Sequence, residues 1–339
     1  MTDAQTVAVL GGGTWGVTLA CLLHDKGERV RLWEYDAAVV AQLVATRVPA
    51  KLPHLAIPAE IEITNNLERA VEGARHWVIV VPSHGVRALA ERLADAARRR
   101  APETIALGTK GIEPDTGLTM TAVVSSAIGE AVAGRVAALS GPSHAEEVSR
   151  QAPTTVVAAA ADEVLAQRVQ ALFNTTRFRV YTVTDALGVE LGAALKNVIA
   201  IAAGVCDGLG FGDNSRAALL TRGLAEITRL GVKMGARPET FAGLAGLGDL
   251  IVTAGSRHSR NRNFGELLGQ GVGADEARAQ IGMEVEGVYA ARSARQLAQR
   301  HHVEMPISRE VYAILYESKA VKDAVHDLLS RDPKPEIWG

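Results

Sequence analysis

Residues 6–16 of this chain read TVAVLGGGTWG, a β-rich run that passes directly into a glycine-rich turn. Gly11, Gly13 and Gly16 satisfy the pattern G-x-G-x-x-G, and residues 14–26 have helical character. In this context the first glycine permits a tight turn, the second lets a pyrophosphate approach the backbone, and the third lets the helix pack against the strand. The segment therefore predicts a dinucleotide site at a helix N-terminus. The alternative is a glycine-rich turn that serves close packing alone.

Further β-rich runs alternate with helical ones through the first half of the chain. The expected strands are residues 6–10, 29–33, 77–81, 104–107 and 136–139, with 154–159 and 178–183 extending the sheet. Strands that alternate with helices predict a parallel, doubly wound sheet. Ligands of such sheets gather at the carboxyl ends of the strands, so the loops there are where functional residues are expected.

The pattern changes at about Ala186. Apolar residues then recur at helical spacing, in residues 190–205, 216–235, 284–301 and 308–316. We therefore expect an α/β Rossmann-like domain with a mostly parallel sheet over residues 1–188, followed by an all-α domain over residues 189–339. The connection is short and apolar, which predicts close packing of the two domains.

Composition limits the partners. With 339 residues and 47% hydrophobic content, the chain can bury a large core. The 36 Lys and Arg nearly balance the 38 Asp and Glu, so no global field favours nucleic acid or an anionic membrane. An anionic ligand must then be met by local charge.

The location is expected to be cytoplasmic. Cys21 and Cys206 lie in apolar stretches without metal-ligand spacing, which predicts buried thiols in a reducing compartment and no metal site. Residues 1–5 do not resemble a signal peptide. Residues 189–205 are apolar but carry Glu190, Lys196 and Asn197, which argues against a membrane span.

Cofactor choice is expected at the end of the second strand, where Trp33, Glu34, Tyr35 and Asp36 follow the glycines by about 20 residues. A carboxylate there accepts hydrogen bonds from the ribose hydroxyls of NAD and repels the 2′-phosphate of NADP. Glu34 thus favours NAD(H), with NADP(H) as the alternative. Two alternatives stay open: Glu34 is a solvated loop acid, or one of two nearby arginines, Arg31 and Arg47, neutralises the phosphate.

Lys196 is the candidate for proton transfer. Its helix neighbours Gly192, Ala193, Ile199 and Ala200 are small or apolar, which leaves room for a ligand. Desolvation would lower the pKa of its amine from about 10.4 towards neutrality. Such a lysine can exchange a proton with a substrate hydroxyl while hydride moves to nicotinamide. The alternative is a surface lysine that extends its amine into water.

Two loops of the ligand-facing layer offer further groups. Lys110 follows a strand, and a cation there would depress the pKa of Lys196 and polarise a carbonyl oxygen. Residues 140–145, SGPSHA, follow another strand, and their backbone and hydroxyl groups can hold an anion. Ordinary turn chemistry is the alternative for both segments.

The helical half contributes a candidate phosphate cluster. Asp249 and Thr253 lie four apart and so share one helical face. Arg260 offers a planar fork suited to phosphate, with Ser259 and Asn261 as neutral donors beside it. A solvated, charged loop is the alternative.

Taken in order, these motifs resemble those of bacterial-type NAD(P)-dependent glycerol-3-phosphate dehydrogenases, through nearly the whole chain. The matching segments are residues 11–16, 110–113, 140–145, 190–197, 248–250 and 259–262. The resemblance implies that Lys196 is the proton acceptor. It implies contacts with glycerol 3-phosphate from Lys110, Gly141, Ser143, Lys196, Asp249, Ser259, Arg260 and Asn261. It implies dinucleotide contacts from Thr14, Trp15, Tyr35, Lys110, Ala145, Arg260 and Glu286.

The chain departs from the family pattern at two positions. Many bacterial members resemble a pattern with a neutral or basic residue where Glu34 stands and prefer NADPH, so Glu34 argues against that preference here. Members often place an apolar residue where Glu284 stands, so Glu286 is carried over as a cofactor contact and Glu284 is not. The resemblance also implies a Rossmann domain followed by a helical domain, and a homodimer that supplies glycerol 3-phosphate for phospholipid synthesis.

Two other functions remain as alternatives. One is a dehydrogenase of similar architecture that acts on a β-hydroxyacid or a sugar nucleotide, since such enzymes use a lysine and asparagine like Lys196 and Asn197. The cluster around Arg260, together with Lys110, favours a small phosphoester. The other is a non-catalytic dinucleotide sensor with a helical partner-binding domain, which would not need Lys196 among small residues.

Overall fold

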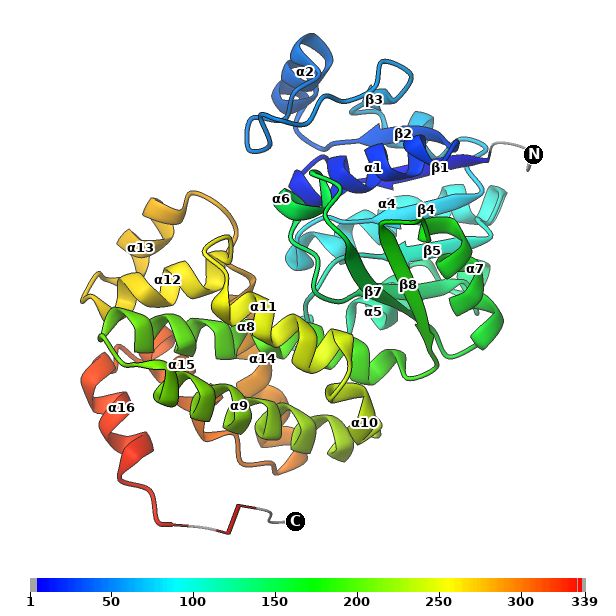
Figure 1. Ribbon diagram of the computed structural model, residues 1–339. Helices are drawn as coiled ribbons and strands as arrows, with labels where there is room; N and C mark the ends of the chain where they lie inside the picture. Colours follow the sequence, from blue (N-terminus) through cyan, green and yellow to red (C-terminus); the bar gives the residue numbers. More distant parts are fainter. Residues whose placement is uncertain (1–4, 334, 337–339) are drawn as a thin grey trace.

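The computed structural model describes residues 5–333 and 335–336, and its first half is built on one sheet (Figure 1). The strand order is β3-β2-β1-β4-β5-β6-β7-β8, and every neighbouring pair is parallel except β6 with β7. The strands are β1 (Thr6–Leu10), β2 (Arg29–Trp33), β3 (Glu62–Thr64), β4 (His76–Ile79), β5 (Thr104–Leu107), β6 (Val136–Ser140), β7 (Thr154–Ala159) and β8 (Phe178–Val183). The predicted doubly wound, mostly parallel sheet is confirmed, and β3 is an addition to it.

Helices cover both faces of the sheet. One face carries α1 (Thr14–Asp25), α6 (Ala145–Val148) and α7 (Glu163–Phe173), and the other carries α3 (Leu67–Val71), α4 (Val86–Arg99) and α5 (Met120–Ile128). Helix α2 (Ala37–Thr46) follows β2, and two 3-10 turns, η1 (Ser83–Gly85) and η2 (Glu130–Val132), complete this half. Strands β1, β4 and β5 are apolar and almost completely buried, as expected for central strands covered on both faces.

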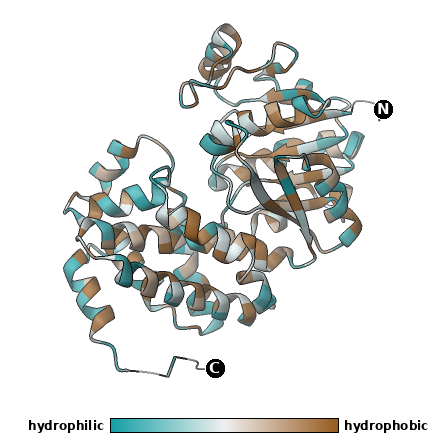
Figure 2. Ribbon diagram, in the orientation of Figure 1, coloured by the Kyte–Doolittle hydropathy of each residue, from teal (hydrophilic) through white to brown (hydrophobic). Residues whose placement is uncertain are grey.

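The second half is helical, as predicted (Figure 1). Its elements are α8 (Ala186–Gly208), α9 (Asp213–Lys233), α10 (Pro238–Phe241), the π-helical turn η3 (Leu244–Gly248), α11 (Asp249–Gly255), α12 (Arg260–Gly269), α13 (Ala274–Ile281), α14 (Glu286–His301), α15 (Pro306–Tyr316) and α16 (Val321–Leu329). Figure 2 shows hydrophobic colour along the strands and inner helices, whereas α13 is mostly hydrophilic. The division at residues 188 and 189 stays a prediction.

Helix α8 is the core of the helical half. It packs against α9, α11, α12, α14 and α15 and buries every residue from 188 to 205. It is long and apolar enough to span a membrane, but 94% of its most apolar window is buried among these helices, which identifies it as a core helix. Its close contact with α12 depends on Gly204, because a Cβ there would lie 1.9 Å from the carbonyl oxygen of Arg262.

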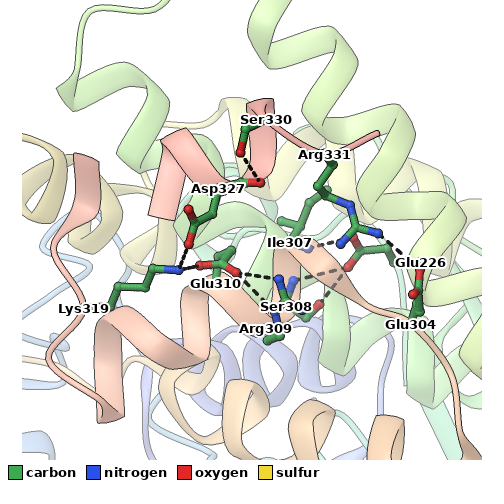
Figure 3. A network of polar contacts seen from close by, with 10 residues as sticks. All are labelled: Glu226, Glu304, Ile307, Ser308, Arg309, Glu310, Lys319, Asp327, Ser330 and Arg331. Carbon is green, nitrogen blue, oxygen red and sulfur yellow. Dashed lines mark hydrogen bonds and ion pairs between the residues drawn. The ribbon is translucent and has the colours of Figure 1, made fainter. Parts of the chain in front are cut away.

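A buried polar network fixes the last helices (Figure 3). Glu226 on α9 is 2% exposed and accepts hydrogen bonds from the backbone N–H groups of Ile307 (2.7 Å) and Ser308 (3.2 Å), at the start of α15. Burial raises the pKa of Glu226 to about 7. Lys319 contacts both Glu310 on α15 and Asp327 on α16. The network thereby joins α9, α15 and α16.

The two cysteines are free thiols. Cys21 is buried in α1, and burial raises its pKa to about 12. Cys206 is only partly buried, so the prediction of two buried thiols is confirmed for the first and wrong for the second. Cys206 lies two residues before the end of α8, just past the run of buried residues 188–205.

Candidate active site

Lys196 lies near the middle of α8 and is buried, with 4% of its side chain exposed. Its Nζ is 3.0 Å from Oδ1 of Asp249 and donates a hydrogen bond to Oγ1 of Thr253. Burial lowers the pKa of Lys196 to about 8; the Asp249 carboxylate opposes this shift, and the charge of Lys110 adds to it. The alternative of a solvent-exposed lysine is therefore wrong, because helix packing covers the amine.

Asp249 holds two lysines together. It is the first residue of α11, directly after the π-helical turn η3, and its side chain is 2% exposed. Its Oδ2 lies 2.6 Å from Nζ of Lys110, while Oδ1 faces Lys196. Burial alone would raise the pKa of Asp249, but the two lysines outweigh it and hold that pKa below its usual value. The carboxylate is therefore ionised and links the two halves of the chain.

Lys110 and Gly141 approach from the carboxyl edge of the sheet. Lys110 follows β5 and Gly141 follows the neighbouring parallel strand β6, so the two loops lie side by side. Nζ of Lys110 donates to the carbonyl oxygen of Gly141 at 3.0 Å, and Oγ of Ser143 donates to the same oxygen at 2.9 Å. Gly141 has φ +139°, a conformation that favours glycine. These contacts bring Lys110, Gly141 and Ser143 together next to Asp249.

His144 is a site residue that sequence reasoning missed. Its Nε2 is buried and has no hydrogen-bond partner among the residues that the structure describes. Burial lowers the pKa of His144, and the charges of Lys196 and Lys110 lower it further. Its ring centroid lies 6.2 Å from that of His258, just before α12. The two imidazoles thus face each other across the boundary between the sheet and the helical half.

The predicted phosphate cluster lies at the start of α12. Ser259 is buried and caps the helix, since its Oγ accepts from the N–H of Arg262 at 3.2 Å. Arg260 is exposed, and its Nη1 donates to the carbonyl oxygen of Glu284 at 2.9 Å. Because the remaining N–H groups of Arg260 have no protein acceptor among the residues that the structure describes, its guanidinium can still bind an anion.

Asn261 serves packing as well. Its Nδ2 donates to Oδ1 of Asn197 on α8 at 3.0 Å, and its Oδ1 accepts from the N–H of Gly287 on α14 at 2.8 Å. The amide therefore joins α12 to α8 and α14. Only one of its N–H groups is left for a ligand.

The glycine turn has the geometry that its sequence predicts. Gly11 has φ +126°, and a Cβ on Gly16 would lie 1.8 Å from the carbonyl oxygen of Gly11, so helix α1 sits directly on the strand. A Cβ on Gly13 would meet nothing within 4 Å, and α1 begins without a side-chain cap. The space above Gly13 and the uncapped N–H groups, beginning at Thr14, suit a pyrophosphate.

The Glu34 side chain contacts the glycine turn. Its Oε2 accepts a hydrogen bond from the N–H of Gly12 at 2.7 Å, and its Oε1 accepts from that of Asp36 at 3.1 Å. Next to it, 76% of the Tyr35 side chain is exposed. Glu34 is therefore not a freely solvated loop acid, because its carboxylate is held against the glycine turn.

The other predicted cofactor residues occupy three places. Trp15, on the first turn of α1, packs with its ring centroid 6.3 Å from that of Phe178, and Ala145 begins α6. Glu286 is the first residue of α14, and its carboxylate accepts hydrogen bonds from the N–H (2.9 Å) and the Oγ–H (2.5 Å) of Ser83, which follows β4. Burial raises the pKa of Glu286. Its described contacts tie α14 to the sheet, and cofactor contact by Glu286 stays a prediction.

Thr253 and Asn197 also belong to the site. The four-residue spacing from Asp249 placed Thr253 on the correct helical face, but nothing in the sequence showed that Lys196 would meet it. Asn197 is buried beside Lys196 and positions Asn261. In the sequence, Asn197 was indicated by its position next to Lys196 in the segment 190–197.

These features define a class of protein. A glycine turn at the carboxyl edge of a Rossmann sheet, facing a buried Lys196 and Asp249 from a helical domain, is the arrangement of a dinucleotide-dependent dehydrogenase. Two family models match the chain: the N-terminal part of NAD-dependent glycerol-3-phosphate dehydrogenase over residues 6–166, and its C-terminal part over residues 185–326. The chain belongs to the NAD-dependent glycerol-3-phosphate dehydrogenase family.

Individual relatives agree with this assignment. The chain is 49% identical to glycerol-3-phosphate dehydrogenase [NAD(P)+] of Geobacter sulfurreducens, over 99% of this chain and 100% of the relative. A crystal structure of glycerol-3-phosphate dehydrogenase from Coxiella burnetii matches with a TM-score of 0.90 and 39% identity, over 97% of this chain and 99% of the other. A 2-dehydropantoate 2-reductase of Geobacter metallireducens, at 14% identity and a TM-score of 0.59 over 93% of this chain and all of the other, shares the fold alone.

Proposed function

We propose that this chain interconverts sn-glycerol 3-phosphate and dihydroxyacetone phosphate, with NAD(P) as the hydride carrier. The observation that carries the proposal is the ion-paired trio of Lys196, Asp249 and Lys110, in which Lys196 and Asp249 are buried and Lys110 is partly buried. Family membership, with identity near one half to a named glycerol-3-phosphate dehydrogenase, supports this substrate over a β-hydroxyacid, a sugar nucleotide or a sensor role.

The charge balance of the site suits a phosphoester. Three cations, Lys196, Lys110 and Arg260, lie near the carboxylate of Asp249, and the charges of Lys110 and Arg260 both lower the pKa of Lys196, so positive charge is in excess around its amine. A phosphate monoester is dianionic near neutral pH and would offset this excess. Arg260 has free N–H groups in the fork geometry that binds phosphate, and Ser143 and Asn261 add neutral donors.

The dinucleotide would bind over Gly11, Gly13 and Gly16, with Thr14 and Trp15 at the start of α1. When bound, the nicotinamide cofactor supplies or takes the hydride. Glu34 would accept from the ribose hydroxyls, which favours NAD(H). The two arginines that the sequence offered as partners of a 2′-phosphate both bind other groups. Arg31 pairs with Glu62 at 3.3 Å, and Arg47 donates to the carbonyl oxygen of Ile61 at 2.8 Å.

Lys196 would move the proton. With a pKa of about 8 its amine is mostly protonated at neutral pH, and in reduction it would donate a proton to the carbonyl oxygen of the substrate. In oxidation the neutral amine would take the proton of the hydroxyl. Asp249 would hold the amine in place, and Lys110 would stabilise negative charge on the same oxygen. The remaining predicted ligands, Gly141, Ser259, Tyr35, Ala145 and Glu286, would shape the two binding sites.

The cellular role follows from the product. We place the chain in the cytoplasm as a homodimer that acts on a small phosphoester, without nucleic acid or membrane insertion, and that supplies glycerol 3-phosphate for phospholipid synthesis. The near balance of acidic and basic residues supports the absence of nucleic-acid binding, and the burial of α8 supports the absence of membrane insertion. Sedimentation of the purified chain tests the homodimer: a monomer at micromolar concentration would contradict it.

The activity has a direct test. The purified chain is mixed with NADH, and its oxidation is followed at 340 nm on adding dihydroxyacetone phosphate or a β-keto acid; a sugar nucleotide, whose hydroxyl groups can only be oxidised, is tested with NAD+ instead. We expect turnover with dihydroxyacetone phosphate alone, and NAD reduction with glycerol 3-phosphate in the reverse direction. Turnover with either of the other substrates and none with the phosphoester would overturn the proposal.

A further inference from the structure

An arginine outside all the predicted site residues lies beside the proposed adenosine position. Arg92 is an exposed residue of α4, and its Cζ lies 5.4 Å from the ring centroid of Trp33 and 6.0 Å from that of Tyr35. The two rings meet edge to face at 6.4 Å. Trp33 is buried, whereas 76% of Tyr35 is exposed to solvent. The guanidinium of Arg92 thus forms cation–π contacts with both rings.

This guanidinium has unused hydrogen-bonding capacity. Apart from the two rings, it has no hydrogen bond or ion pair with any residue in the part of the chain that the structure describes. Arginines elsewhere on α4 differ: Arg87 forms a bidentate pair with Glu113 at 2.7 Å, and Arg98 pairs with Asp95. A planar fork with its donors unsatisfied is the group that best matches a phosphate.

The position of Arg92 bears on cofactor choice because Glu34 and Tyr35 are adjacent. Glu34 lies against the glycine turn through the N–H of Gly12, so its carboxylate marks the ribose position. The extra phosphate of NADP sits on that ribose, and Glu34 repels it. A cation held over the ring of Tyr35, the residue after Glu34, can offset this repulsion.

We propose that Arg92, seated on Trp33 and Tyr35, is a specificity-determining residue that binds the 2′-phosphate of NADP(H) and so lets a chain with Glu34 use both cofactors. The inference rests on the proposed function only for the placement of the dinucleotide over the glycine turn. It assigns opposite effects to two side chains that flank one ring: Glu34 lowers the affinity for NADP(H), and Arg92 restores part of it.

The test compares kcat/KM for NADPH and NADH, with saturating dihydroxyacetone phosphate, in the native chain and in Arg92→Gln. We expect the NADPH value to fall by about tenfold, the usual effect of losing one charge-assisted contact, and the NADH value to change less than about threefold. Arg98→Gln is the matched control, because Arg98 is exposed on the same helix and pairs with Asp95; it should alter neither value.

Two results would overturn the proposal. Equal losses with both cofactors would mean that Arg92 contacts the shared part of the dinucleotide, and unchanged values with both would mean that it contacts neither. Calorimetric titration of the two variants with NADP+ and NAD+ keeps the inference separate from the reaction. If the native chain turned over no substrate, the proposed function would fail, whereas a selective loss of NADP+ affinity in Arg92→Gln would still support the role of Arg92.

Discussion

Replacing Asp249 by Asn should change how the reaction responds to pH. The substitution keeps the shape of the side chain but removes the only carboxylate between two lysines, whose Nζ atoms lie 3.0 Å (Lys196) and 2.6 Å (Lys110) from its oxygens. Asp249 raises the pKa of Lys196 against burial and against Lys110. Without it the pKa of Lys196 must fall below about 8.

The structure sets the size of this fall. Opposite unit charges 3.0 Å apart interact by about 5 kcal/mol at an effective dielectric near 20, which is an upper bound because the pair also loses solvation. An adjacent opposite charge typically moves a pKa by about 1–3 units. We therefore expect an inflection near pH 5–7 in Asp249→Asn. Reduction needs the protonated amine, so the variant should lose about threefold (pKa 7) to more than about 100-fold (pKa 5) in rate at pH 7.5 and recover part of it below pH 6.

The assay is the pH dependence of kcat/KM for dihydroxyacetone phosphate between pH 5 and 10, with saturating NADH. Asp207→Asn is the matched control: Asp207 is also a buried aspartate held by two cations, Arg216 and Arg262, but it does not contact Lys196. The control should lower stability without moving the inflection. An inflection that stays near pH 8 in Asp249→Asn would refute the assignment of the titrating group to Lys196.

Three further predictions concern the phosphate, the ribose and the fold. Arg260→Ala should raise KM for dihydroxyacetone phosphate by about tenfold or more, since charged hydrogen bonds contribute roughly 1.5–3 kcal/mol each, with some loss of cofactor affinity; an unchanged KM would exclude phosphate contact. Glu34→Ser should shift kcat/KM towards NADPH by about tenfold, and a constant ratio of the two cofactors would show that Glu34 does not contact the ribose. Glu226→Ala should lower the free energy of unfolding in urea by about 2–4 kcal/mol, because the N–H groups of Ile307 and Ser308 lose their acceptor; an unaltered urea midpoint would contradict this.

Local chemistry explains which parts of the fold could be predicted from the sequence. The turn at Gly11 and Gly16 could be predicted because steric requirements act over a few residues. Strand β3 was missed because three residues are too few to show a periodic pattern and are ordered by pairing with β2. Strand β4 covers His76–Ile79, whereas residues 77–81 were expected. It therefore begins one residue earlier and ends two residues earlier than predicted.

In the candidate site, too, local features could be predicted from the sequence and features that depend on packing could not. Spacing placed Asp249 and Thr253 on one helical face, but the ion pair of Asp249 with Lys110 spans 139 residues and depends on how the two halves pack. The small neighbours of Lys196 indicated room around its amine, whereas its burial depends on the helices that surround α8. Arg92 could not be found, because nothing in the sequence relates α4 to Tyr35.

The central claim is that Lys196 transfers the proton. Its most direct test is the single-turnover rate of NADH oxidation by dihydroxyacetone phosphate in Lys196→Ala, with cofactor affinity measured in parallel. The account predicts a rate lower by on the order of 10²-fold or more, nearly unchanged affinity for NADH, and loss of the inflection near pH 8. A near-native rate with the same pH dependence in Lys196→Ala would contradict it.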